Sequence, residues 1–298
     1  MKTKGLIAAP PTAFRTDGGI DIDVVAPLAR HLKAQGVIGA YVNGTTGEGM
    51  SLTTDEREQL AAEWRRVLPD RIKLFVHVGH NSSGEAMRMA RHAQAIGADA
   101  VAAIAPNFFK PDGIEGLVDW CATIAAAAPK LPFYFYHMPS LSGVNANITE
   151  FLQKAADRIP NLGGIKFTYE ALSDYMTAGQ VCNGRFDMLW GRDEMLLGAL
   201  AMGAEGGVGS TYNTIAPLYL KLIEAFNNGD WQTARALQSE SIAFINDLVA
   251  TGNFLAALKA VLRSQDVPIT PAVRLPIAPV AEEKLAGLGC RNKRQTRK

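Results

Sequence analysis

Short apolar runs alternate with longer amphipathic segments through the first 228 residues. Eight of the apolar runs have the length of a β-strand: 5–10, 36–44, 72–79, 98–106, 131–139, 162–168, 186–191 and 204–210. The segments between them place apolar residues three and four apart, as in "DIDVVAPLARHLKAQG", which is the spacing of a helix with one buried face. This alternation of strands and helices predicts an α/β fold of the (β/α)8 or TIM-barrel type.

An open, doubly wound sheet is the alternative that the same alternation permits. A dinucleotide-binding sheet of that kind carries G-x-G-x-x-G directly after its first strand. No such motif follows residues 5–10, and the glycine-rich segment "GAEGGVGS" belongs to the last predicted strand instead. The barrel is therefore the favoured architecture.

The pattern changes after Asn228, where only helical segments follow. Three are expected, at 230–250, 253–265 and 278–289, with four prolines from just after the second to the start of the third. We predict a catalytic barrel at 1–228 and a C-terminal three-helix extension at 229–298. The extension ends in the basic run "RNKRQTRK", which we interpret as a frayed, solvated terminus rather than a nucleic-acid-binding arm.

Composition narrows the classes of protein that need to be considered. The chain has 298 residues, is 48% hydrophobic and 20% charged, and has a formal net charge of +1. These values are typical of a globular enzyme and argue against a disordered chain or a nucleic-acid-binding protein. No apolar run approaches the roughly 20 residues of a membrane helix, and no signal peptide is recognised. Three widely spaced cysteines favour the cytoplasm over a disulfide framework.

Polar residues gather where the predicted strands end. In a (β/α)8 barrel, catalytic groups lie at the carboxyl ends of the strands. Lys166 falls within the sixth strand, "LGGIKFT", where inward side chains fill the barrel. Burial would lower the pKa of its amine and leave a neutral nucleophile able to form a Schiff base with a carbonyl. The alternative is a surface lysine at a strand end.

Tyrosines at the end of the fifth strand are candidates for proton transfer beside Lys166. A phenol close to a Schiff-base nitrogen can relay protons. Tyr136 is the nearer to the strand end, but Tyr134 shares its face by pleat alternation, so alternation does not choose between the two. Either could also be an ordinary core aromatic.

Two further strand ends carry groups suited to binding. In "GTTGE", the hydroxyl and N–H groups of Thr45 and Thr46 could bind a carboxylate, although the segment could be an ordinary turn. In "GRDE", Asp193 could bind sugar hydroxyls or could simply cap a helix. His77 and His80 lack acidic or cysteine partners at ligand spacing, so no metal site is expected.

Taken together and in order, these motifs resemble a known enzyme family. They are "GTTGE", "YHMPSLSG", "GGIKFT", "WGRDEMLLGALAMGAEGGVGSTYN" and "TGNFLAALKAVL". The chain resembles, over nearly its whole length, the pyruvate-dependent class I aldolases that include N-acetylneuraminate lyase and dihydrodipicolinate synthase. The resemblance implies a carbon–carbon lyase that needs no metal or organic cofactor, because a lysine serves as the electron sink.

The lyase branch is the more similar one. Synthases typically carry an arginine where Leu141 stands, and a tyrosine lent across a subunit interface where this chain has Phe108 and Phe109. The resemblance thus implies reversible cleavage of N-acetylneuraminate, a sialic acid, to N-acetylmannosamine and pyruvate by a homotetramer. The alternatives are an aldolase of the same family that acts on another 2-keto-3-deoxy sugar acid, and a barrel that binds a sugar acid without catalysis.

The resemblance also implies roles for individual residues. Lys166 would form the Schiff base, Tyr136 would relay the proton, and Thr45 and Thr46 would hold the carboxylate. The sugar portion would contact Thr168, Gly191, Asp193, Glu194 and Ser210, with Phe254 as a pocket wall. Many bacterial lyases have serine where Thr45 stands; the hydroxyl is retained, and the added methyl could change the substrate preference.

Overall fold

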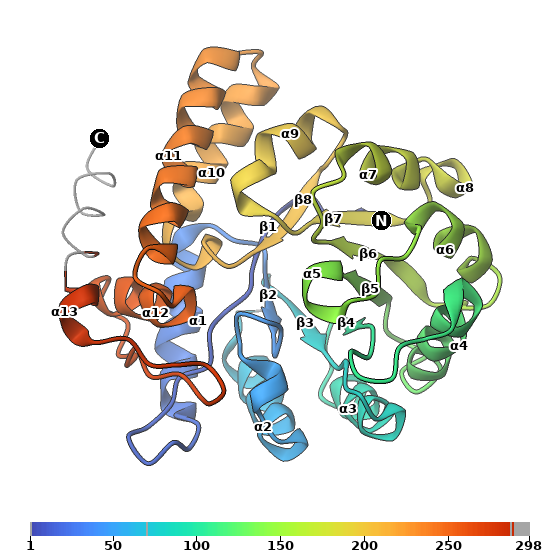
Figure 1. Cartoon of the computed structure of the whole chain (residues 1–298), viewed down its shortest axis with the longest axis horizontal. Helices are drawn as coiled ribbons and strands as arrows, with labels where there is room; N and C mark the ends of the chain where they lie inside the picture. The colour runs from blue at the N-terminus through green and yellow to red at the C-terminus, as the bar shows by residue number, and fades with distance from the viewer. Residues whose placement is uncertain (1, 70, 287, 289–298) are drawn as a thin grey trace.

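Eight parallel strands form a closed barrel, as the alternating pattern predicts (Figure 1). The computed structural model describes residues 2–69, 71–286 and 288. Each strand pairs with the next, and β8 closes the barrel against β1. The strands are β1 (Gly5–Ala8), β2 (Gly39–Val42), β3 (Lys73–His77), β4 (Ala100–Ile104), β5 (Phe133–His137), β6 (Leu162–Phe167), β7 (Asp187–Trp190) and β8 (Gly206–Gly209).

Helices surround the barrel and connect its strands (Figure 1). The longer ones are α1 (Val25–Gln35), α2 (Thr54–Val67), α3 (Ser83–Ala95), α4 (Gly113–Ala125), α6 (Ile148–Ala155), α7 (Leu172–Gly179) and α10 (Tyr212–Asn227). The shorter ones are η1 (Ile22–Val24), η2 (Gly49–Ser51), α5 (Pro139–Ser142), α8 (Val181–Gly184), η3 (Asp193–Met195) and α9 (Leu196–Ala201). Local signals define their ends: a reciprocal capping box between Thr53 and Glu56 starts α2, and left-handed Gly36 ends α1.

The core has two layers because successive side chains of a strand point to opposite faces. One layer lies between the strands and the surrounding helices. The other fills the inside of the barrel and includes Ile7, Tyr41, Phe75, Tyr134, Tyr136, Leu189 and Val208. The inner layer forms the floor on which a site at the mouth of the barrel is built.

After α10, the described residues form helices and no strand, at one side of the molecule (Figure 1). They are α11 (Trp231–Val249), α12 (Phe254–Ser264) and α13 (Glu282–Leu285). α11 packs along α10, and α12 contacts both. In the described part of the chain, no individual helix combines the length and apolar composition to cross a membrane. α11 and α12, bent by 111°, meet that test only as a pair, on length and composition.

The third C-terminal helix is shorter at its start than its sequence pattern predicts. We expected it from residue 278, but α13 begins at Glu282. Pro279 disfavours a helical conformation for Ala278, whose carbonyl oxygen instead accepts a hydrogen bond from Asn253 Nδ2 at 2.6 Å. The basic run from Arg291, predicted to be frayed, lies outside the described residues.

Candidate active site

Lys166 lies inside the barrel at the mouth end of β6. Its side chain is only 5% exposed. Strand register places it beside Tyr136 of β5 and Leu189 of β7. The ammonium position, Nζ, lies 4.0 Å from the ring centroids of both Tyr41 and Tyr136. The alternative of a surface lysine is therefore wrong.

This environment favours the neutral amine. Burial lowers the pKa of Lys166 to about 7, and the Coulomb attraction of Asp193 opposes that shift. At neutral pH a large fraction of the amine is unprotonated and carries the lone pair that a nucleophile needs. The two aromatic faces can also stabilise a cation formed on this nitrogen.

Tyr136, not Tyr134, faces the same space as the Lys166 amine. Its hydroxyl oxygen lies 3.3 Å from Thr45 Oγ1, and it donates to Met138 Sδ at 2.8 Å. Burial raises the pKa of Tyr136, so the phenol keeps its proton at neutral pH. Tyr134 pairs with Gly164, one pleat deeper, and donates to Asp187 Oδ2 at 3.0 Å at the other end of the barrel. The choice between Tyr134 and Tyr136, which pleat alternation left open, is thus decided by how deep each side chain lies in the barrel.

The turn after β2 brings two hydroxyls to the mouth. Thr45 Oγ1 approaches Tyr136, and Thr46 Oγ1 lies 2.6 Å from Ser210 Oγ, which follows β8. Glu48 N–H donates to the Thr45 carbonyl within the turn. Among the described residues, no protein acceptor is used by the N–H groups of Thr45, Thr46 and Gly47. Hydroxyls and N–H groups gathered in this way suit an anion.

Asp193 lies on the opposite side of the pocket and is not a helix cap. Its Oδ2 accepts hydrogen bonds from Thr211 N at 2.8 Å and from Thr211 Oγ1 at 2.6 Å. Burial raises the pKa of Asp193 to about 6, and the Thr211 contacts limit that rise. Glycine is required at residue 209, because a Cβ there would collide with the Asp193 carboxylate. The side chain is therefore fixed as an acceptor at the pocket wall.

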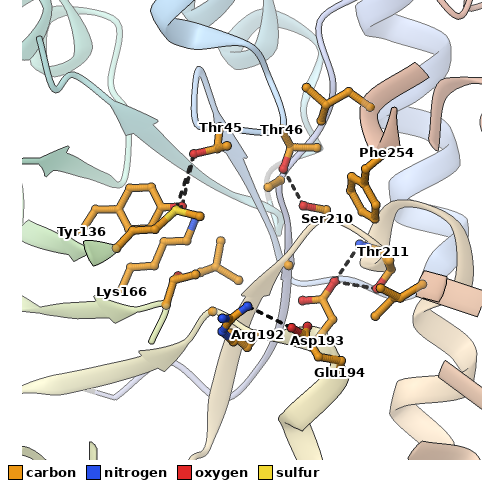
Figure 2. Close-up of a pocket in the computed structure, with 18 residues that line it drawn as sticks. Thr45, Thr46, Tyr136, Lys166, Arg192, Asp193, Glu194, Ser210, Thr211 and Phe254 are labelled. Atoms are coloured by element: carbon orange, nitrogen blue, oxygen red, sulfur yellow. Dashed lines mark hydrogen bonds and ion pairs between the residues drawn. The ribbon is translucent and has the colours of Figure 1, made fainter. Parts of the chain in front are cut away.

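All the predicted site residues converge on one cavity of about 300 Å³. Figure 2 shows Lys166 and Tyr136 on one side of it, with Asp193, Thr211 and Phe254 across from them. The predicted residues that line it are Thr45, Thr46, Tyr136, Lys166, Thr168, Gly191, Asp193, Glu194, Ser210 and Phe254. A glycine is needed at residue 191, since a Cβ there would collide with Thr168 Oγ1.

The two histidines serve the fold. The His77 ring is buried, with Nδ1 3.1 Å from the Asn43 carbonyl oxygen and Nε2 accepting from Ile104 N at 3.2 Å. Burial lowers the pKa of His77, so the ring is neutral. His80 Nδ1 accepts from Ser82 N at 2.9 Å. Over the ranges 2–69, 71–286 and 288, no group of three or more His, Cys, Asp or Glu side chains is placed to hold a metal ion.

Comparison with known proteins identifies the family. The profile of the dihydrodipicolinate synthetase family matches residues 2–291. The chain belongs to that family. Mouse (Mus musculus) N-acetylneuraminate lyase is 40% identical over 286 residues, which are 95% of this chain and 89% of the mouse protein.

Solved structures of bacterial family members superpose closely. N-acetylneuraminate lyase (sialic acid aldolase) from Aliivibrio salmonicida has a TM-score of 0.94 at 41% identity, covering 99% of this chain and 97% of that one. Proteus mirabilis N-acetylneuraminate lyase has a TM-score of 0.95 at 39% identity, covering 99% of each chain. The resemblance inferred from the sequence motifs is confirmed.

Several pocket residues of this family member were not singled out by the sequence reasoning. They are Ala9, Met138, Arg192, Val208, Gly209, Thr211, Ile245 and Leu255. Arg192 forms ion pairs with Glu170 and, at 3.1 Å, with Glu194, so it orients an acid at the pocket edge. The strand-end rule could have found Arg192 and Thr211, because both lie beside residues that it did select. Ile245 lies within α11, near its C-terminal end, where that rule does not apply.

Proposed function

We propose that this protein is a class I aldolase that cleaves N-acetylneuraminate reversibly to N-acetyl-D-mannosamine and pyruvate. The observation that carries the proposal is the Lys166 amine, buried between two aromatic rings with a pKa of about 7. The names of the mouse, A. salmonicida and P. mirabilis relatives support the choice of substrate.

Lys166 begins the reaction as a nucleophile. The neutral amine attacks the C2 ketone of the open-chain sugar acid, and loss of water with uptake of one proton from solvent gives a protonated Schiff base. Thr45 and Thr46 hold the substrate carboxylate with their hydroxyl and N–H groups. The iminium then withdraws electrons from the C3–C4 bond, so no metal or organic cofactor is needed for this step.

Tyr136 moves the proton that bond cleavage releases. Because its raised pKa keeps the phenol protonated, it acts as a relay. It takes the proton of the C4 hydroxyl while passing its own proton to the substrate carboxylate. Cleavage gives the aldehyde of N-acetylmannosamine and an enamine on Lys166. Protonation of the enamine at C3 and hydrolysis of the resulting iminium release pyruvate and the free lysine.

The remaining pocket residues bind the sugar portion. Asp193, Glu194 and Ser210 accept hydrogen bonds from sugar hydroxyls, with Thr168 and Gly191 completing that side and Phe254 forming a wall. Acceptors facing a cavity of this size suit a polyhydroxylated chain.

We also propose that the enzyme works as a homotetramer in the cytoplasm. The exposed aromatic side chains of Phe108 and Phe109, at 76% and 85%, support self-association. The free thiols of Cys121 and Cys182 support a reducing compartment.

The test is pyruvate release from N-acetylneuraminate, followed with a coupled lactate dehydrogenase, in the parent protein and in Lys166→Ala. We expect release that disappears in the variant, together with loss of the borohydride-trapped pyruvate adduct. Tyr136→Phe should still form the adduct but turn over roughly 10²- to 10⁴-fold more slowly. No release by the parent, with the adduct intact, would move the assignment to another 2-oxo acid; no adduct would leave a binding protein.

A further inference from the structure

The turn that carries Thr45 and Thr46 has a backbone that needs support. Asn43 before it and Glu48 at its end have φ values of 60° and 53°, in the left-handed region that favours glycine. Gly49 follows, and a Cβ there would collide with the Asn43 carbonyl oxygen. Such conformations persist only where the surrounding structure holds them, and they cluster at functional sites.

Lys259 of α12 provides a buried contact to this turn. Its Nζ donates to Glu48 Oε1 at 2.6 Å and to the Ala272 carbonyl oxygen at 2.6 Å. Both side chains of the ion pair are fully buried. Buried charges are stable only when paired, so the Glu48 carboxylate depends on this lysine. The first residue of the same helix, Phe254, lines the pocket.

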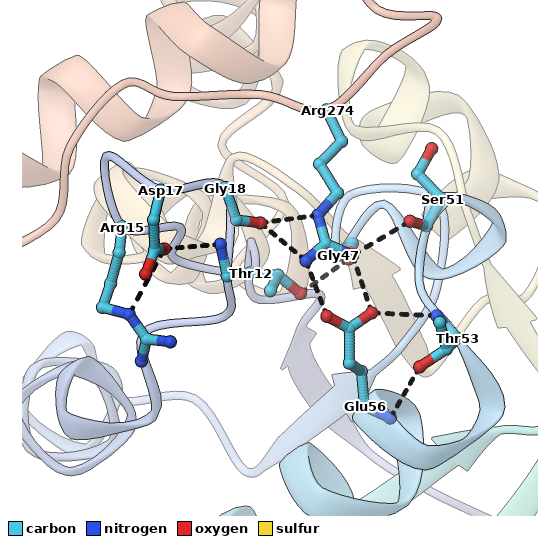
Figure 3. A network of polar contacts seen from close by, with 10 residues as sticks. Thr12, Arg15, Asp17, Gly18, Gly47, Ser51, Thr53, Glu56 and Arg274 are labelled. Atoms are coloured by element: carbon cyan, nitrogen blue, oxygen red, sulfur yellow. Dashed lines mark hydrogen bonds and ion pairs between the residues drawn. The ribbon is translucent and has the colours of Figure 1, made fainter.

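The segment after α12 holds the turn from a second direction (Figure 3). Arg274 N donates to Glu48 Oε2 at 2.9 Å. The Arg274 guanidinium donates to both carboxylate oxygens of Glu56 at 2.6 Å and to the Gly18 carbonyl oxygen at 2.7 Å. Thr12 Oγ1 donates to the Gly47 carbonyl oxygen at 2.6 Å. The turn is thus tied to α2, to the segment after β1 and to the C-terminal region.

We propose that Lys259 and Glu48 are positioning residues, whose ion pair holds Thr45 and Thr46 in the geometry that binds the substrate carboxylate. The inference rests on the proposed function of that turn. Neither side chain lines the pocket that contains Lys166, and the Glu48 carboxylate bonds to Lys259 and Arg274, so the pair acts through the turn and not on the reacting atoms. Its loss should weaken the binding of 2-oxo acids and spare ketones that have no carboxylate.

Borohydride trapping on Lys166 separates these two classes of ligand. Pyruvate is compared with hydroxyacetone, a small ketone without a carboxylate, in the parent, in Lys259→Met and in the Glu48→Gln/Lys259→Met double variant. At low ketone concentration, both variants should trap pyruvate roughly ten- to a hundredfold more slowly than the parent. We expect the parent to trap hydroxyacetone weakly, and both variants should trap it at the parent's rate.

The matched control is Lys154→Met, the same change at an exposed ion pair with Glu115. It should leave both trapping rates unchanged. If Lys259→Met does not fold, the double variant decides, because it has no charge left at either position. Loss of folding in both would assign the pair to stability alone and overturn the proposal.

Two results with folded variants would also overturn the proposal. One is unchanged pyruvate trapping. The other is an equal loss with pyruvate and hydroxyacetone, which would indicate general damage to the pocket. A parent protein that traps no pyruvate would reject the proposed function, and this inference with it, before any variant is made.

Discussion

Two buried lysines in this molecule have opposite chemical fates. Lys166, at the barrel mouth, lies over the rings of Tyr41 and Tyr136, and no ion pair of it occurs among the described residues. Lys259, in α12, forms an ion pair with Glu48 at 2.6 Å. Burial lowers the pKa of both, but only Lys259 has a carboxylate in contact that opposes the shift.

The difference shows that burial alone does not make a lysine reactive. A carboxylate in contact stabilises the charged form and turns the buried lysine into a structural tie. Aromatic faces attract a cation more weakly than a carboxylate does, so the amine at Lys166 is partly neutral at neutral pH. Lys166 is therefore a buried group whose protonated form lowers the stability of the fold.

Removing Lys166 and removing Lys259 should change the free energy of unfolding in opposite directions, and this is the largest effect that we expect. The folded state holds the Lys166 proton less tightly than the unfolded state, with a pKa of about 7 against 10.5. The free-energy cost of a protonated Lys166 in the folded state is complete below pH 7 and disappears above pH 10.5. Lys166→Met should therefore be more stable than the parent by roughly 4 kcal/mol near pH 6 and by little near pH 10.5. Lys259→Met should be less stable by about 3–5 kcal/mol, since it leaves Glu48 unpaired.

Urea unfolding at the two pH values measures both changes. Lys154→Met, at an exposed pair, should change stability by less than about 1 kcal/mol and serves as the reference. A Lys166→Met protein less stable than the parent at pH 6 would contradict the account of a costly protonated amine.

The position of Lys166 could be predicted from the sequence because barrel topology places it. Parallel strands bring their carboxyl ends to one face, so residues far apart in the chain, such as Thr45 and Asp193, meet without any contact information. Tyr136 could not be separated from Tyr134, because the period of two gives both the same face. The distinction needs the register, in which Tyr136 is level with Lys166.

The structural lysine could not be predicted. Lys259 and Glu48 are 211 residues apart, and no local pattern couples them. In "FLAALKAVL" the lysine interrupts an apolar stretch, a position that equally suits a side chain reaching solvent along the helix. The start of α13 differs from the prediction for local reasons: Pro279 disfavours a helical Ala278, and Ala281 just before the helix is extended, with φ −60° and ψ 139°.

The pH dependence of adduct formation sharpens the comparison at the reactive lysine. Only the neutral amine attacks, so the second-order rate of pyruvate adduct formation should fall tenfold per unit as the pH drops below about 7. Above that value the rate should level off. Cyanoborohydride trapping from pH 5 to 10 measures the profile. A rate that keeps rising to pH 10 would mean that Lys166 has the pKa of an exposed lysine.

The smallest effect that we expect concerns Asp193, a carboxylate that acts on Lys166 from a distance. Asp193 raises the pKa of Lys166 by Coulomb attraction, so Asp193→Asn should move the acid limb of the pyruvate profile to lower pH by less than about one unit. The asparagine can still accept the Thr211 hydrogen bonds, so the wall of the pocket should stay in place.

Glu194→Gln is the matched control, since Glu194 does not shift the pKa of Lys166. Pyruvate lacks the sugar portion that Asp193 is proposed to bind, so the shift reports only on the amine. An acid limb that moves to higher pH in Asp193→Asn would show that Asp193 does not raise the pKa of Lys166, and would contradict this account of the amine.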